Sequence, residues 1–111
     1  MFKHKFLQKA VAVITEHLSD TALGVESLAD ELAVSRSVLL KKIQALVGEA
    51  PCELIRRMRL TAAARLIESN FGSISEIALE VGFSNPSYFA ECFMQQFGVT
   101  PSHYHRNAVA Q

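Results

Sequence analysis

A small group of polar side chains early in the chain has the chemistry needed to contact a nucleic acid. Arg36, Ser37, Lys41 and Gln44 recur at helical spacing, on the side opposite the apolar residues of the same stretch. Two cations, a hydroxyl and an amide on one exposed face can bind phosphate oxygens and hydrogen-bond to base edges. The pattern therefore favours a surface that reads DNA.

The residue types that commonly carry catalysis or bind metal ions are sparse and poorly placed. His103 and His105 lie two positions apart, so they do not share a face of a helix. Cys52 and Cys92 lack the paired spacing of a zinc or redox site. The sequence also contains no Ser–His–Asp set and no glycine-rich phosphate loop. We therefore expect neither an enzyme nor a bound cofactor or metal ion.

The elements that must position a DNA-reading surface are clearest in residues 73–106. Ser73 and Glu76 have the spacing of a capping box at the start of a helix. Gly82 stands where that helix needs a left-handed residue to end, and Asn85 is followed by proline, as in a cap and first helical position. Two helices joined by a short glycine-containing turn form a helix-turn-helix, whose second helix commonly enters a DNA major groove.

The first half of the chain repeats this pattern. Ser35 is a good cap for a helix that runs to about Val47, and Gly48 ends it. One added residue in the second turn shifts the offset between the halves from 49 to 50. The matched positions before the turn are Leu28 with Ile77, Ala29 with Ala78, Leu32 with Val81 and Ser35 with Ser84. Those after it include Leu39, Ile43, Val47, Gly48 and Pro51 with Phe89, Phe93, Phe97, Gly98 and Pro101.

These patterns predict an all-α fold of about seven helices, with two helix-turn-helix subdomains joined by a long linker helix. Residues 1–50 form the first unit, including a scaffold helix over residues 2–18, and residues 70–111 form the second unit with a short last helix. The linker helix occupies residues 51–69. We expect one side of it to be apolar, formed by Leu54, Ile55, Met58, Ala62, Leu66 and Ile67.

Charge is concentrated in the middle of a chain that is neutral as a whole. Residues 1–35 carry a net −2, residues 36–65 a net +5, and residues 66–111 a net −3. Such a local field can hold phosphates even when the total charge is zero. Arg56, Arg57 and Arg59 cluster near the start of the linker helix, either to hold phosphates or as a solvated face.

The stretches ISEIALEVGF, SNPSYFAECF and QQFGVTPSHY, with SLADELAVSRSVLLKKI and RRMRLTAAARLIESN before them, resemble the AraC/XylS family of bacterial transcription regulators over about residues 5–106. The resemblance implies two reading helices, over residues 36–47 and 86–97. It implies base contacts by Ser37, Leu40 and Lys41 in the first and by Ser87, Ala90 and Glu91 in the second. The expected phosphate contacts are Arg36, Lys42, Arg56, Arg57, Arg59 and Asn85.

The second reading helix departs from the family pattern in its charge. Glu91 stands where that pattern usually has a basic residue, and Met94 where it has lysine. A carboxylate can accept a hydrogen bond from cytosine N4, so Glu91 is either a base reader or a repulsive charge that weakens the second unit.

The stretch SDTALGVESLADELAVSRSVLLKKIQALVGEAP looks most like the C-terminal output domains of hybrid two-component regulators. The resemblance implies a sequence-specific regulator of transcription in the cytoplasm, with double-stranded promoter or operator DNA as its partner. RNA polymerase and upstream receiver and sensor domains are further expected partners, and we expect no membrane contact. An alternative is a protein-interaction module, in which only the first unit contacts DNA and the acidic second unit docks on RNA polymerase or another partner.

Overall fold

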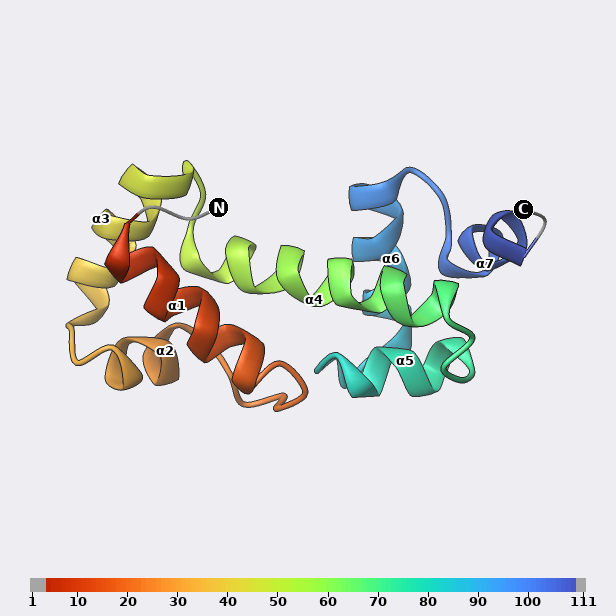
Figure 1. Cartoon of the computed structure of the whole chain (residues 1–111), viewed down its shortest axis with the longest axis horizontal. Helices are drawn as coiled ribbons and strands as arrows, with labels where there is room; N and C mark the ends of the chain where they lie inside the picture. Colours follow the sequence, from red (N-terminus) through yellow and green to blue (C-terminus); the bar gives the residue numbers. More distant parts are fainter. Residues whose placement is uncertain (1–3, 110–111) are drawn as a thin grey trace. The chain divides into compact units, whose positions relative to one another are not determined.

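The computed structural model describes residues 4–109, which form seven α-helices and no strand (Figure 1). The helices are α1 (Lys5–Glu16), α2 (Val25–Glu31), α3 (Arg36–Val47), α4 (Pro51–Glu68), α5 (Ile74–Glu80), α6 (Pro86–Phe97) and α7 (Pro101–Val109). The all-α prediction is confirmed. Residues 2 and 3 of the expected scaffold helix lie outside the described range, and its last turn ends at Glu16. None of the helices in residues 4–109 combines the length and hydrophobicity of a membrane crossing.

The chain divides within α4 into two compact units, which we call unit 1, ending at Met58, and unit 2, beginning at Arg59. In unit 1 the helices α1, α2 and α3 and the first part of α4 bury one aliphatic core. Apolar burial of this kind is the main stabilising term of a small domain. The buried residues are Leu7, Ala10, Ile14, Leu23, Leu28, Ala29, Leu39, Ile43, Leu54 and Ile55.

Unit 2 buries a core that is rich in aromatic rings. Phe89 and Phe93 are fully buried on α6, and the Phe93 ring lies 4.5 Å from that of Phe97 and 5.4 Å from that of Tyr104, between ring centroids. The Phe83 ring meets the Phe89 ring edge-on at 5.2 Å. Offset and edge-on aromatic pairs add stabilisation beyond their buried area. The phenylalanines that the repeat aligns with Leu39, Ile43 and Val47 therefore form the centre of unit 2.

The predicted helix caps are present. The Ser35 hydroxyl accepts from the Val38 N–H at 3.2 Å, and Ser73 and Glu76 bond reciprocally, at 3.1 Å from the Glu76 N–H and 2.9 Å from the Ser73 N–H. Because the ionised Glu76 carboxylate accepts that backbone bond, its pKa is held below the ordinary value. Gly48 ends α3 in the left-handed conformation, as predicted.

The turns of the two helix-turn-helix units have the same hydrogen-bond pattern. The Val34 N–H donates to the Ala29 carbonyl at 3.0 Å, and at the offset of 49 the Phe83 N–H donates to the Ala78 carbonyl at 2.8 Å. The loop over residues 81–85 is one residue longer than that over 32–35, which confirms the inserted residue. The left-handed position is Gly82 in unit 2, with φ 94°, but Ala33 in unit 1, with φ 56°.

The predicted apolar residues of α4 all pack in a core, but the predicted set was incomplete. Leu60, Ala63 and Ala64 are buried although they do not belong to the predicted stripe. The reason is that the two ends of α4 pack in different cores: Leu54 and Ile55 belong to that of unit 1, whereas these three residues belong to that of unit 2. A helix that serves two cores does not show one continuous stripe.

Side-chain hydrogen bonds connect α7 to the last residue of α4 and to the turn that follows α4 in unit 2. The Tyr104 hydroxyl donates a short hydrogen bond to the Glu68 carboxylate, which raises the pKa of Tyr104 above its ordinary value. The His105 Nε2 lies 2.7 Å from the Asn70 Oδ1, an oxygen that can only accept, so the imidazole donates. The last helix is therefore held at two successive positions.

Candidate nucleic-acid interface

The helix α3 presents a polar, positively charged face outside the core of unit 1. Leu39 and Ile43 are fully buried, and this fixes the rotation of the helix about its axis. Ser37, Lys41 and Gln44 recur at spacings of four and three residues, and all three are exposed. The Lys41 side chain makes no hydrogen bond or ion pair within residues 4–109. Its ammonium group is therefore available to an acceptor on a ligand.

Two other cations of α3 contact the protein itself. The Arg36 guanidinium lies 3.6 Å from the Glu26 carboxylate, and both side chains are well exposed. An exposed pair of this kind contributes about 0–1 kcal/mol, so a phosphate can compete with it. The Lys42 ammonium lies 4.6 Å from the centre of the Phe6 ring of α1. This cation–π contact places the Lys42 charge beside α1, away from the stripe formed by Ser37, Lys41 and Gln44.

The arginines of α4 make more contacts with the protein itself than the sequence indicated. Both Nε and Nη2 of Arg57 donate to the same Glu49 oxygen, at 2.7 and 2.6 Å. Arg56 and Arg59 are half-buried, and both make further contacts with the protein. A phosphate at Arg57 must therefore share or displace the Glu49 carboxylate, which lowers the gain from binding it.

The helix α6 presents the corresponding face of unit 2 with different chemistry. The Asn85 Oδ1 accepts from the N–H groups of Ser87 and Tyr88, at 2.9 and 3.1 Å, so this side chain caps the helix. Ser87 and Glu91 are exposed and Ala90 is half-buried. The sequence of α3 contains three cations and no acid, whereas α6 contains one acid and no cation. The two helices therefore differ in net charge, +3 for α3 and −1 for α6.

Two large apolar side chains on α6 were not among the predicted contacts. Tyr88 and Met94 each keep 47% of their surface exposed. Met94 lies three positions after Glu91, and hence on the same face of the helix. The sequence could have indicated Met94 as a contact residue, because it lies three positions after Glu91 and seven after Ser87 on a predicted reading helix.

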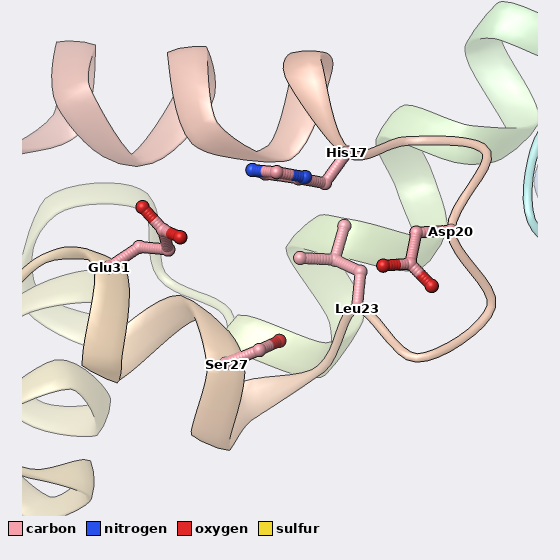
Figure 2. Close-up of a pocket in the computed structure, with 5 residues that line it drawn as sticks. All are labelled: His17, Asp20, Leu23, Ser27 and Glu31. Carbon is pink, nitrogen blue, oxygen red and sulfur yellow. The ribbon is translucent and has the colours of Figure 1, made fainter.

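A small hollow of about 120 Å³ lies in unit 1 between the end of α1 and α2 (Figure 2). Figure 2 shows the His17 ring and the Glu31 carboxylate extending into the same space. The Ser27 hydroxyl, also in its wall, accepts from the Gly24 N–H at 2.9 Å, and the Asp20 carboxylate accepts from the Ala22 N–H at 2.9 Å. These two groups are used in local turns, and within residues 4–109 no group of three His, Cys, Asp or Glu residues is arranged to hold a metal ion.

The comparison with known families agrees with this geometry. A family model described as a helix-turn-helix domain, of the AraC/XylS type, matches residues 28–107. The chain belongs to this family. The match begins at the buried Leu28 of α2 and extends into α7, so it contains both helix-turn-helix motifs.

Two solved structures are similar over nearly the whole chain. The DNA-binding domain of AdpA, solved in complex with a target DNA, is 31% identical, with a TM-score of 0.88 and coverage of 96% of each chain. The C-terminal domain of AraT, a response regulator from Geobacillus stearothermophilus, is 33% identical, with a TM-score of 0.87 and coverage of 94% of this chain and 86% of that one. These similarities confirm a DNA-binding regulator domain of this family and not an enzyme.

The curated relatives are much longer than this chain. Histidine kinase P4 of Formosa agariphila is 39% identical over 100 residues, which cover 90% of this chain but 7% of that protein. The chain spans between 7% and 34% of the length of eight such relatives. The similarity therefore concerns one domain of each relative and not its other activities.

Proposed function

We propose that α3 and α6 each enter a major groove of double-stranded DNA and that the chain reads a promoter or operator sequence in this way. The observation that carries the proposal is the outward face of α3, where Lys41 is exposed and unpaired within residues 4–109. A reading helix places such donors against base edges. The AdpA domain, similar over 96% of this chain, was solved with its target DNA, which supports the same role here.

The roles of the base readers follow from the chemistry of the groove. Lys41 donates to guanine O6 or N7, Ser37 bonds to a donor or an acceptor, and Leu40 contacts a thymine methyl group. The reading helix of unit 2 takes the corresponding positions on the adjacent segment of the groove. The proposed base readers are Ser37, Leu40 and Lys41 of α3 and Ser87, Ala90 and Glu91 of α6.

Phosphate contacts supply most of the affinity and its dependence on salt. Arg36 lies next to the stripe of α3, Lys42 lies beside α1, and the arginines of α4 lie on the element that follows α3. Asn85 keeps its amide group for a phosphate while its carbonyl oxygen caps α6. The proposed phosphate contacts are Arg36, Lys42, Arg56, Arg57, Arg59 and Asn85.

The proposal extends to the longer protein of which such a domain is commonly a part. We place it as the output module of a two-component regulator in the cytoplasm, with receiver and sensor domains upstream and RNA polymerase as a partner at the promoter. For the domain layout we propose a first helix-turn-helix region over residues 1–50, a linker helix over 51–69 and a second helix-turn-helix region over 70–111, with the boundary between the compact units 1 and 2 inside the linker helix. The alternative, a module in which unit 2 docks on a partner while only unit 1 contacts DNA, gains no support from the similar proteins reported above.

Selection of bound sequences from a random duplex pool, followed by affinity measurements at several salt concentrations, tests the proposal. Five proposed cationic phosphate contacts predict a slope of log affinity against log salt of about −4.5, since each contact releases about 0.9 counterion. We expect one enriched sequence and a slope of this size. Binding without an enriched sequence, or with a slope near zero, would overturn the proposal.

A further inference from the structure

The outward stripe of α6 carries a hydrogen-bond acceptor and an apolar group where that of α3 carries two donors. Ser87, Glu91 and Met94 occupy positions i, i+4 and i+7 of α6 and are all exposed, while Phe89 and Phe93 on the opposite side are fully buried. At the repeat offset of 50, the stripe of α3 is serine, lysine and glutamine. The two helices therefore offer different chemistry to the floor of a groove.

The Glu91 carboxylate has no partner of its own on the protein. It makes no hydrogen bond or ion pair within residues 4–109, and α6 contains no cation to neutralise it. A phosphate repels such a group, whereas an amino group at a base edge donates to it. In the major groove only cytosine N4 and adenine N6 present amino groups.

The neighbouring atoms on each base decide between these two amino groups. Adenine presents the N7 acceptor beside its N6 amino group, and this acceptor repels a carboxylate. Cytosine presents its N4 amino group without an acceptor on the same base. The edge chemistry therefore favours cytosine over adenine as the partner of a carboxylate.

The Met94 side chain adds an apolar contact one turn further along the stripe. It keeps 47% of its surface exposed and lies three positions after Glu91, about 4.5 Å along the helix axis. Because successive base pairs are only ~3.4 Å apart, a side chain displaced by this distance faces a different base pair from the one that Glu91 faces. The thymine methyl is the apolar group of the major groove, so Met94 fits a thymine next to the cytosine.

From these observations we infer that Glu91 and Met94 are specificity-determining residues of unit 2, which select a cytosine and an adjacent thymine. The inference rests on the proposed function, because it requires α6 to lie in a major groove. Unit 2 would then prefer pyrimidines, through an amino group and a methyl group. Unit 1 would prefer purines, because Lys41 and Gln44 suit the acceptor-bearing edges of guanine and adenine.

We call the base pairs that each unit contacts its half-site. The test begins with duplexes in which the half-site of unit 1 has its selected sequence and the half-site of unit 2 is randomised. For the parent protein we expect cytosine to be favoured by about tenfold at one position, with thymine enriched at a neighbouring one. The variant Glu91→Gln keeps the size of the side chain but carries the amide that pairs with adenine N6 and N7. Its preferred base is therefore expected to change from cytosine to adenine.

A second arm tests Met94 without changing any hydrogen bond. Replacing the selected thymine by deoxyuridine removes only the methyl group, and this is expected to weaken parent binding by about threefold. The same replacement should leave the affinity of Met94→Ala unchanged. Leu79→Ala, which removes an exposed apolar side chain from α5, is the matched control and should respond to deoxyuridine as the parent does.

The outcomes separate this inference from the function on which it rests. A flat preference at the second half-site, combined with tighter binding of Glu91→Ala to every sequence, would make Glu91 a repulsive charge and overturn the inference. The selected half-site of unit 1 would still be bound, and the proposed function would stand. Absence of binding to any duplex at low salt would overturn both.

Discussion

Units 1 and 2 share a backbone plan but use different side chains in it. Both have the same turn hydrogen bond and the same glycine end to the reading helix. The core of unit 1 is aliphatic, whereas unit 2 packs Phe83, Phe89, Phe93, Phe97 and Tyr104 against one another. The net charge of the reading helix changes from +3 on α3 to −1 on α6. The repeat therefore preserves the positions that determine the backbone and lets the contact surface diverge.

The largest expected effect comes from truncating the aromatic core. Phe93→Ala should destabilise unit 2 by about 3–5 kcal/mol, because Phe93 is fully buried and its ring contacts three others. The repeat equivalent, Ile43→Ala, should destabilise unit 1 by about 2–5 kcal/mol. Hydrogen exchange should show protection lost first in α5–α7 for Phe93→Ala and in α1–α3 for Ile43→Ala. Equal loss throughout the chain in both variants would show that the units do not unfold separately.

The second effect concerns the difference in charge between the two outward faces. Lys41→Ala should weaken binding to the selected sequence by about 1–3 kcal/mol and relax the base preference at one position of the first half-site. Lys9→Ala removes the same charge from the exposed side of α1 and serves as the control. Fluorescence anisotropy on the selected duplex and on single-base variants measures both. If the two variants bind alike, Lys41 is not a base reader.

A third, smaller effect distinguishes the caps of the first helix in each motif. Ser73→Ala should destabilise unit 2 by about 1 kcal/mol, because it leaves the Glu76 N–H without its acceptor. In unit 1 the corresponding cap position is Gly24, and the Ser27 hydroxyl accepts from its N–H. Urea titrations of Ser73→Ala and of Ser27→Ala compare the two caps directly, and an unchanged midpoint for Ser73→Ala would contradict the role given to it.

The same pair of caps predicts that the stability of the two units depends differently on pH. Hydrogen bonds with Ser73 lower the pKa of the Glu76 carboxyl group in the folded state. The stability that the ionised carboxylate contributes is therefore fully present above its unfolded pKa of about 4.3, and it is lost as the pH falls through the folded pKa. The cap of unit 1 contains no titratable side chain. The stability difference between the parent and Glu76→Gln should therefore narrow as the pH falls below about 4. A difference that stays constant down to pH 3 would exclude this linkage.

The smallest effect comes from the left-handed residue in each turn. A left-handed conformation costs an L-residue about 1–2 kcal/mol, whereas glycine adopts it freely but adds about 0.4–1 kcal/mol of unfolded-state entropy. Ala33→Gly should therefore stabilise unit 1 by about 0.5 kcal/mol, since Ala33 has φ 56°. The same change at Ala12, inside α1, should destabilise by about 1 kcal/mol. Thermal unfolding of the two variants should show shifts of opposite sign.

Much of the fold was predictable because its signals are local. Ser35, Ser73 and Asn85 cap their helices within three residues of the groups they bond, and Gly48 ends α3 through its own backbone conformation. The repeat added evidence for the boundaries, because each half predicts the other. The left-handed Ala33 could have been found in the same way, from its alignment with Gly82.

The remaining features depend on contacts between residues that are distant in the chain. The sequence shows that Lys42 and Arg57 are cations, but not that one lies over the Phe6 ring and the other is bonded to Glu49. The burial of Leu60 depends on which core each part of α4 joins. The candidate readers were predicted as residue types at positions, while their accessibility required the packed structure.

Chemical footprinting of both strands on the selected duplex tests the central claim most directly. If α3 and α6 each read a major groove, the chain should protect two adjacent major-groove segments. Lys41→Ala should then weaken protection at the first and Glu91→Gln should alter it at the second. Protection of a single segment of about 5 base pairs, unchanged by Glu91→Gln, would contradict the account, because only one reading helix would then contact DNA.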